Sequence, residues 1–231
     1  MKIKIVNLAL LLISMFGTLL ALSFLPDEIP VHFDFYGVAD RWGSKYEMLI
    51  MPVIMLFMLG TWLVTERANM KALDSADEKK VAEARANNKV MAFTFTAISI
   101  LFLFLNGLFL YLSCSQLEGV ALPEVDIMRV IAVIMGVLFI VLGNVMPKAK
   151  SNRTVGFRMP WTRFNDVTWY KCNRFGGIAM MISGLITALG GLIFGGVVAS
   201  IIMMLSVFGS LIVILIYAYL VYTDERKKAD K

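Results

Sequence analysis

Six apolar stretches recur along the chain, and each is about as long as a helix that crosses a bilayer. They span residues 5–25, 48–65, 90–113, 127–146, 176–195 and 197–222. Because a membrane span needs about 20 predominantly apolar residues, we predict an all-α, polytopic membrane protein with six transmembrane helices. The connections are shorter than the roughly 50 residues of a small independent domain, so we predict no soluble domain.

The first stretch follows a positively charged start, as in a secretory signal peptide. Lys2 and Lys4 supply that charge. The apolar run exceeds the roughly 7–15 residues typical of a signal peptide, so we expect it to be retained as a membrane helix.

The basic residues are divided unevenly between the two sides of the predicted bundle. The N-terminus, the connections 66–89 and 147–175, and the C-terminal tail hold 19 of the 22 Lys and Arg residues. Since cytoplasmic loops are enriched in these residues, both termini are predicted to be cytoplasmic. The net charge of +5 then divides into +10 on the inner segments and −5 on the outer ones. A basic inner face is explained by membrane lipid, and we predict no direct nucleic-acid binding.

The composition excludes several kinds of chemistry. Hydrophobic residues make up 59% of the chain, and there is one histidine, His32. No sequence motif of a metalloprotease or a serine hydrolase is present, so we predict no enzymatic activity, no cofactor and no metal. Cys114 and Cys172 fall on opposite sides of the predicted membrane and cannot pair within the chain. Asn106, inside the third stretch, is expected to form an interhelical hydrogen bond, with a transport site as the alternative.

Small residues recur every four positions in the fifth stretch and predict close helix packing. The sixth stretch is the expected partner because only a tight turn separates the two, and homodimerisation is the alternative; the oligomeric state stays open. The predicted packing residues are Ser183, Thr187, Gly191 and Gly195.

The connection 66–89 is predicted to be helical. Ser75 and Glu78 have the spacing of a capping box, and the Ala-, Lys- and Glu-rich residues after them favour a helix. This helix is expected to continue into the third stretch.

The outer connection, residues 26–47, combines turn-forming residues with a compact set of aromatic ones. The alternation of Val31, Phe33 and Phe35 predicts a short extended segment, and we expect the loop to fold over the outer mouth of the bundle. Its candidate ligand-binding residues are Pro30, His32, Phe33, Gly37, Asp40, Trp42 and Lys45.

The inner connection, predicted to span residues 147–175, interleaves basic residues with two tryptophans. Arginine and tryptophan bind lipid headgroups and also dominate protein interfaces, so both kinds of partner are considered. The candidate partner- or lipid-binding residues are Asn152, Gly156, Arg158, Pro160, Trp161, Thr162, Trp169, Asn173 and Arg174.

These two connections resemble parts of a known family. The inner stretch from Pro147 to Gly177, with its core Gly156-Phe-Arg158-Met-Pro160-Trp161-Thr162, resembles the signature of the SdpI family. The outer stretch from Leu25 to Pro52 resembles an uncharacterised membrane domain often found N-terminal in that family. Asn173 departs from the pattern, since many members have histidine there.

The resemblance implies a multi-pass protein of the bacterial cytoplasmic membrane that confers immunity to a secreted peptide toxin. It further implies that the toxin binds on the outer face and that a cytoplasmic autorepressor is recruited to the inner face. The alternative is a small uncoupled transporter. The implied organisation is a two-helix unit over residues 1–65, a cytoplasmic helical loop over 66–89, and a four-helix SdpI-like region over 90–231.

Overall fold

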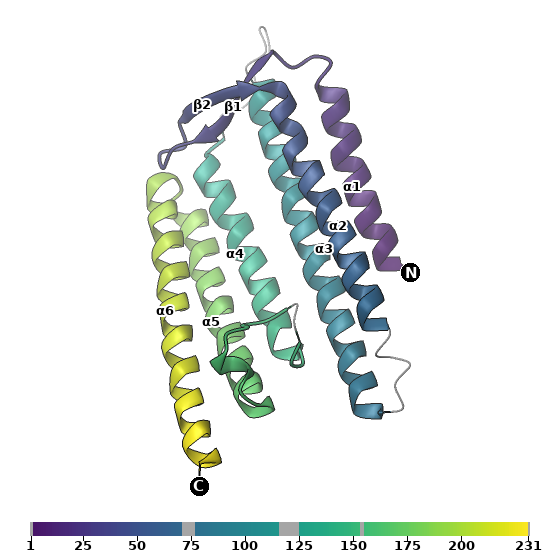
Figure 1. Cartoon of the computed structure of the whole chain (residues 1–231). Helices are drawn as coiled ribbons and strands as arrows, with labels where there is room; N and C mark the ends of the chain where they lie inside the picture. Colours follow the sequence, from purple (N-terminus) through teal and green to yellow (C-terminus); the bar gives the residue numbers. More distant parts are fainter. Residues whose placement is uncertain (1, 71–76, 116–124, 153–154, 231) are drawn as a thin grey trace.

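The computed structural model describes residues 2–70, 77–115, 125–152 and 155–230 (Figure 1). Within these residues, six helices are long and apolar enough to cross a membrane, which confirms the predicted six-span architecture. The helices are α1 (Lys2–Ala21), α2 (Ile50–Met70), α3 (Glu78–Cys114), α4 (Ile127–Val145), α5 (Asp166–Ile193) and α6 (Gly196–Ala229). The shorter elements are β1 (Glu28–Phe33), β2 (Ala39–Ser44) and the 3-10 helices η1 (Lys45–Leu49), η3 (Met146–Lys148) and η4 (Trp161–Arg163).

The fifth helix begins earlier than its apolar pattern predicts. It starts at Asp166 rather than at residue 176, so the prediction that residues 166–175 belong to the loop 147–175 is wrong. A capping box starts the helix: the Asn165 side chain accepts a hydrogen bond from the Thr168 backbone N–H at 2.8 Å, and the Thr168 hydroxyl accepts one from the Asn165 N–H at 3.0 Å. These polar residues stabilise a helix end that hydropathy does not detect.

The third helix runs without interruption from the 66–89 connection into the membrane region, as predicted. Its N-cap is Asp77, whose carboxylate accepts hydrogen bonds from the backbone N–H groups of Lys79 and Lys80 at 3.0 and 3.3 Å. The bond from Lys80 is the main reason that the pKa of Asp77 lies below its usual value of 3.8. Ser75, the predicted start of the capping box, lies outside the described residues.

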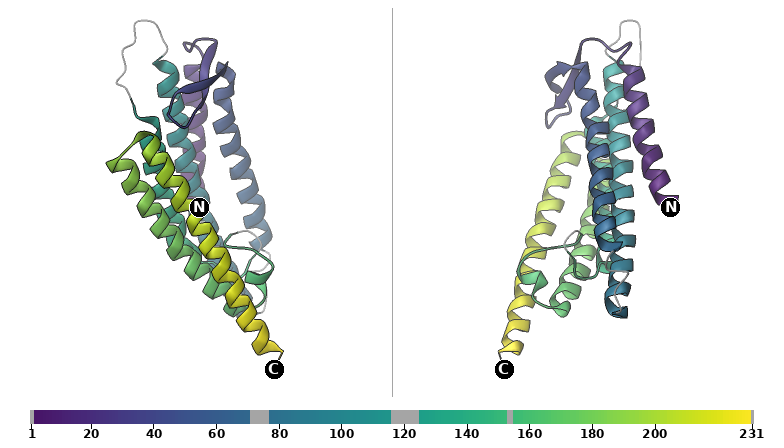
Figure 2. Two further views of the ribbon diagram at one scale, coloured as in Figure 1. Left: turned by 90° about the vertical axis from the view of Figure 1, so that its left-hand side faces the viewer. Right: turned by 45° about the vertical axis from the view of Figure 1, so that its right-hand side comes forward.

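The helices form two groups, α1–α3 and α4–α6, which lie side by side (Figures 1 and 2). α3 packs against α1 and α2 and also contacts α4, so it joins the two groups. The β1–β2 hairpin lies at one end of the bundle and the α4–α5 connection at the other. The division of the chain at residues 65 and 89 stays a prediction.

Buried polar side chains join α1 to α3. The Asn106 amide nitrogen donates to Thr18 Oγ1 at 3.2 Å, and its oxygen accepts from the Ser14 hydroxyl at 3.3 Å. Closer to the inner end, the Asn7 amide donates to Thr96 Oγ1 at 2.7 Å. The expected interhelical hydrogen bond of Asn106 is therefore confirmed.

Replacing Asn106 with leucine is expected to lower the free energy of unfolding by about 1 kcal/mol, because interhelical hydrogen bonds in membranes contribute roughly that much. Thr61→Val is the matched control, since the Thr61 hydroxyl donates to the Met58 carbonyl oxygen of its own helix at 2.8 Å. Unfolding of the purified protein by increasing SDS measures both variants. Equal losses in the two would contradict a specific α1–α3 bond.

Glycines bring α4 and α5 into backbone contact. A Cβ atom on Gly136 would lie 2.5 Å from the Ala188 amide nitrogen, and one on Gly143 would lie 2.5 Å from the Gly177 carbonyl oxygen. On the facing helix, a Cβ on Gly184 would lie 2.5 Å from the Gly136 carbonyl oxygen. Side chains at these positions would push the helices apart, so glycine is what allows this approach.

The small residues of α5 meet two partners rather than the one expected. Thr187 faces α6, where its hydroxyl lies 2.7 Å from Ser206 Oγ. Gly191 instead faces α4, because a Cβ there would lie 3.0 Å from Ala132 Cβ. The expectation that these residues pack only against α6 is wrong. An α-helix has 3.6 residues per turn, so residues spaced by four do not stay on one face, and successive members of the row point toward different neighbouring helices. Ser183 is buried within α5, and Gly195 is the N-cap of α6 with a φ of 67°.

The outer connection forms an antiparallel hairpin across the outer ends of the helices (Figure 1). Its first strand confirms the predicted extended segment. At the tip, Gly37 has a φ of 81°, and the Asp34 carboxylate accepts hydrogen bonds from the N–H groups of Tyr36 and Val38 at 2.8 and 2.9 Å. The tip reaches α4, since a Cβ on Gly37 would lie 3.8 Å from the Met128 side chain. The hairpin therefore spans both groups of helices.

Candidate functional site

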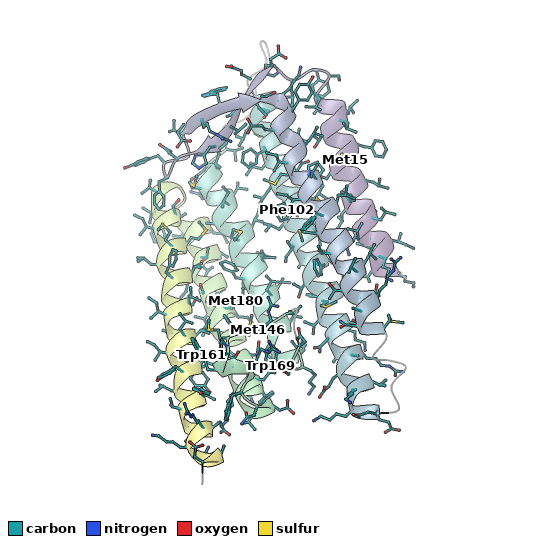
Figure 3. The ribbon with its side chains drawn as sticks, viewed as in Figure 1. Met15, Phe102, Met146, Trp161, Trp169 and Met180 are labelled. Carbon is teal, nitrogen blue, oxygen red and sulfur yellow. The ribbon has the colours of Figure 1, made fainter. Side chains whose placement is uncertain are left out.

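The chain between α4 and α5, residues 146–165, folds against the inner end of α5; we call it the inner segment. Several side chains at its contact with α5 are fully buried and polar: Thr162, Thr168 and Asn173 are each 0% exposed. Figure 3 shows Trp161 and Trp169 at this end of the bundle. Buried polar groups require hydrogen-bond partners, so their bonds determine how the inner segment is held.

Asn173 attaches the inner segment to α5. Its side-chain oxygen accepts a hydrogen bond from the Phe157 backbone N–H at 2.9 Å, and its amide nitrogen donates to the Trp169 carbonyl oxygen at 3.0 Å. The neighbouring Gly156 has a φ of 111°, and a Cβ there would lie 2.6 Å from Asn173 Oδ1. Glycine is therefore required at 156 both by the backbone conformation and by the approach to Asn173.

Trp169 anchors the first part of the inner segment. Its indole N–H donates to the Ala149 carbonyl oxygen at 2.8 Å. The ring packs in a small buried cluster with Val90 of α3, Val145 of α4 and Ala149. One side chain of α5 thus contacts residues from three different parts of the chain.

Thr162 closes the turn that carries the signature proline. Its hydroxyl donates to the Phe157 carbonyl oxygen at 2.6 Å and accepts from the Met159 backbone N–H at 2.9 Å. The Thr168 hydroxyl lies 3.2 Å from the Thr162 carbonyl oxygen. Because Thr162 is fully buried, it supports the conformation of the segment and presents no surface to a partner.

Two asparagines connect the inner segment to α3. The Asn152 side chain accepts from the Val155 N–H at 2.7 Å and donates to the Lys150 carbonyl oxygen at 2.6 Å. Asn87 of α3 accepts a hydrogen bond from the Lys150 backbone N–H at 2.9 Å. The segment is therefore bound to both groups of helices.

Three of the predicted inner residues, Arg158, Pro160 and Arg174, are exposed, and Trp161 is half-buried. The Arg174 guanidinium donates to the Tyr170 hydroxyl at 3.1 Å and lies 6.0 Å from the centre of that ring. The remaining predicted residues of this set support the segment from within. The structure thus separates a buried scaffold from a small exposed basic-aromatic surface, which comprises Arg158, Pro160, Trp161 and Arg174.

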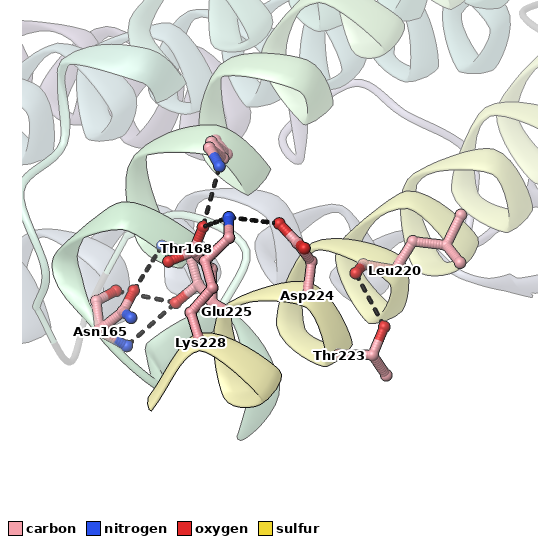
Figure 4. Close-up of polar contacts among 8 residues, drawn as sticks. Asn165, Thr168, Leu220, Thr223, Asp224, Glu225 and Lys228 are labelled. Carbon is pink, nitrogen blue, oxygen red and sulfur yellow. Dashed lines mark hydrogen bonds and ion pairs between the residues drawn. The ribbon is translucent and has the colours of Figure 1, made fainter. Parts of the chain in front are cut away.

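The inner end of α6 holds this region from the other side. The carboxylate of Glu225 pairs with Lys171 of α5 at 3.0 Å and with Lys228 at 3.2 Å (Figure 4). The Trp161 ring meets the Tyr219 ring edge-on, with centroids 6.5 Å apart. These contacts fix the exposed basic-aromatic surface relative to α5 and α6.

The predicted outer residues lie on the hairpin, at the opposite end of the bundle. Pro30 is buried, whereas Trp42 is 50% exposed. His32 Nδ1 lies 2.6 Å from Asp40 Oδ1 on the facing strand. Among the described residues, no group of three or more His, Cys, Asp or Glu side chains is placed to hold a metal ion. The contact between His32 and Asp40 makes them a cross-strand pair.

Phe33 and Lys45 attach the hairpin to the bundle. The Phe33 ring packs against Phe109 of α3 with centroids 5.9 Å apart. The Lys45 ammonium pairs with Asp27 at 3.0 Å and donates to the Leu25 carbonyl oxygen at 3.4 Å. Of the predicted outer residues, Trp42, His32 and Asp40 remain most accessible.

Two family models match this chain. Residues 9–56 match the family described as Domain of unknown function (DUF1648), and residues 148–222 match the SdpI/YfhL protein family. The chain is therefore similar to the SdpI family in its signature segment and its last two helices. It is also 26% identical over 192 residues to a protein named Immunity protein SdpI from Bacillus subtilis (strain 168), covering 81% of each chain. No solved structure matches it.

The SdpI family match contains the inner segment from Lys148 onward, the whole of α5 and α6 as far as Tyr222. The DUF1648 match contains most of α1, the whole hairpin and the start of α2. Together with the six spans, the family match makes the chain a multi-pass bacterial membrane protein. The SdpI family is not an enzyme family.

The sequence did not reveal two sets of residues that determine this geometry. Asn87 lies in the connection 66–89, for which the sequence predicts only a helix, and nothing in its neighbours distinguishes it from Asn88. The α4–α5 contact, in contrast, is visible in the sequence as a shared glycine spacing. Gly136 and Gly143 are as far apart in the sequence as Gly177 and Gly184. Matching glycine spacings in two apolar stretches would have predicted that pair of helices.

Proposed function

We propose that this SdpI-like protein is a membrane immunity protein that protects its cell against a secreted peptide toxin. The observation that carries the proposal is the similarity to Immunity protein SdpI, which extends over 81% of both chains. A match over 192 residues is much longer than the signature segment alone. An SdpI-like immunity function is what this similarity supports.

The outer hairpin is the proposed toxin-binding element. It exposes aromatic side chains, with Tyr36 73% and Trp42 50% accessible, next to the His32–Asp40 pair. Exposed aromatic residues on a rigid element provide large contact areas for a peptide. The contact of the hairpin tip with α4 supplies a route by which binding could alter the bundle.

The exposed basic-aromatic surface is the proposed docking site for a cytoplasmic autorepressor. Arg158 projects from the inner segment, which is hydrogen-bonded to α3 and α5, and Arg174 projects from α5 itself, so both arginines lie on elements that are ordered before a partner binds. Preorganised arginine and tryptophan side chains are typical anchors of protein interfaces. The same chemistry binds lipid headgroups, which is the competing role for this surface.

The immunity proposal is tested by protection. A toxin-sensitive bacterium that lacks its own immunity gene is transformed with this chain and exposed to the toxin that its host encodes. Survival at least tenfold above that of the empty vector is expected. Unchanged survival, at membrane levels of the protein verified by immunoblot, would contradict the proposal.

Arg158→Glu and Arg174→Glu are each expected to reduce repressor recruitment at least tenfold, because they reverse the charge of an interface anchor. The measurement is the membrane-bound fraction of a tagged repressor encoded beside the gene, in cells exposed to toxin. Lys227→Glu is the matched control, since Lys227 is exposed at the same end of the bundle but on α6. Recruitment that is unchanged in both arginine variants would contradict this docking site.

The transport alternative depends on Asn106, and the bonds of this residue favour a structural role. Both its amide nitrogen and its oxygen are engaged by side chains of α1. Because both polar atoms of the Asn106 side chain are already hydrogen-bonded to α1, this residue contributes to helix association rather than to substrate binding.

A further inference from the structure

A groove follows the seam between α3 and α4, and cations line its inner part. This part has a volume of about 940 Å³ and lies between the first turns of α3 and the inner end of α4. Arg85, Lys89 and Lys148 line it, with Glu78 as its acidic residue. None of these three cationic side chains forms an ion pair or a hydrogen bond with another described residue.

Other lysines at the same end of the molecule are neutralised by carboxylates. Their ion pairs are Lys4–Glu66 at 2.6 Å, Lys79–Asp166 at 3.4 Å and Lys171–Glu225 at 3.0 Å. The cations of the groove thus differ from these neighbours in having no such partner among the described residues. An anion that entered the groove would meet uncompensated positive charge.

The groove continues toward the membrane centre as an apolar channel. This second part has a volume of about 750 Å³ and is lined by α1, α3 and α4. Phe93 belongs to both parts and joins them. Lys2 lies at the apolar part as well, and the rest of the lining is almost entirely aliphatic and aromatic, including Phe104 and Val137.

The dimensions of the apolar part correspond to one leaflet. From Phe93 to Phe104, α3 rises roughly 16 Å at 1.5 Å per residue. The hydrocarbon core of a bilayer is about 30 Å thick, so one leaflet is about half of that. A cationic site at the inner boundary followed by an apolar groove of leaflet length matches a phospholipid that has its headgroup on the cytoplasmic side.

We propose that the α3–α4 seam binds one anionic phospholipid of the inner leaflet. Arg85, Lys89 and Lys148 hold the phosphate, while the acyl chains lie along Phe93, Phe104 and Val137. Basic pockets between membrane helices on the cytoplasmic side favour anionic headgroups. A soluble phosphate would use the cations but leave the apolar part empty, so the shape of the whole groove favours a lipid.

The test compares lipids on the purified full-length protein in detergent. Added phosphatidylglycerol is expected to raise the unfolding temperature by roughly 4 °C, and phosphatidylcholine by less than half as much. Native mass spectrometry is expected to show one retained phosphatidylglycerol per chain. Equal stabilisation by the two lipids would overturn the proposal, and so would an equal shift on adding soluble glycerol phosphate.

Two variants test the two parts of the groove separately. Arg85→Gln/Lys89→Gln/Lys148→Gln is expected to abolish the preference for phosphatidylglycerol, whereas the matched triple variant Arg67→Gln/Arg163→Gln/Lys227→Gln keeps it. Val137→Trp fills the apolar part at a position that is 51% exposed and is expected to reduce lipid retention at least threefold with all cations intact. The same loss in the matched triple variant, or full retention in Val137→Trp, would overturn the proposal.

Discussion

A single methyl group added at Gly184 is expected to lower the free energy of unfolding by about 1–3 kcal/mol, and leucine there to prevent α4 and α5 from packing. The new Cβ would lie 2.5 Å from the Gly136 carbonyl oxygen and 2.8 Å from the Ile140 amide nitrogen. Both neighbours are backbone atoms of a helix, so neither can rotate away. The helices would have to separate along their whole contact.

The free energy of unfolding of Gly184→Ala is measured by SDS titration, and folding of Gly184→Leu by its yield as a monodisperse protein. Gly209→Ala and Gly209→Leu are the matched controls, because a Cβ on Gly209 of α6 meets nothing within 4 Å. Alanine at 209 is expected to be neutral or slightly stabilising, since glycine is a poor helix former. If substitutions at 184 and 209 had equal effects, the α4–α5 contact would not be as close as described.

Asn173→Ala is expected to release the inner segment from α5 while leaving the six helices in place. The substitution leaves the Phe157 N–H without its acceptor and removes the bond to the Trp169 carbonyl oxygen. An unsatisfied buried group costs about 1–3 kcal/mol. Cleavage by trypsin after Arg158 should then be about 10-fold faster or more, as measured by mass spectrometry of the fragments.

Two further variants distinguish a specific effect from a general loss of stability. Asn144→Ala changes an exposed asparagine at the inner end of α4 and should leave the cleavage rate unchanged. Asn173→His retains a group that can accept the Phe157 N–H, and should be cleaved more slowly than Asn173→Ala. Faster cleavage in Asn144→Ala, or equal rates in the two Asn173 variants, would contradict the role of this hydrogen bond.

Much of the fold could be predicted because lipid imposes simple requirements on sequence. Runs of apolar residues identified the helices, and Asn106 stood out because a polar amide within such a run needs a partner. The start of α5 could not be predicted in the same way. Its first turns extend beyond the apolar run and depend on the Asn165–Thr168 capping box, which hydropathy does not register.

The sequence predicted which residues belong to the candidate site, but not which of them are buried and which are exposed. The signature placed Thr162, Trp169 and Asn173 beside Arg158 and Arg174 without distinguishing their roles. Burial separates them, because the side chains of the first three are buried and hydrogen-bonded to backbone groups, while the two arginines are exposed. Such a distinction depends on contacts with α3, including Asn87, and these come from a part of the chain distant in sequence.

The glycine contact also has a mechanical consequence. Since backbone meets backbone at Gly136 and Gly143, α4 and α5 cannot slide or rotate past one another without a steric clash. Tightly packed elements of this kind move as a unit. The outer end of α4 touches the hairpin tip near Met128, and the inner end of α5 carries Asn173. If the hairpin tip tilted the outer end of this helix pair, the inner end of the pair would move in the opposite direction. The inner segment, which is hydrogen-bonded to Asn173, would move with it.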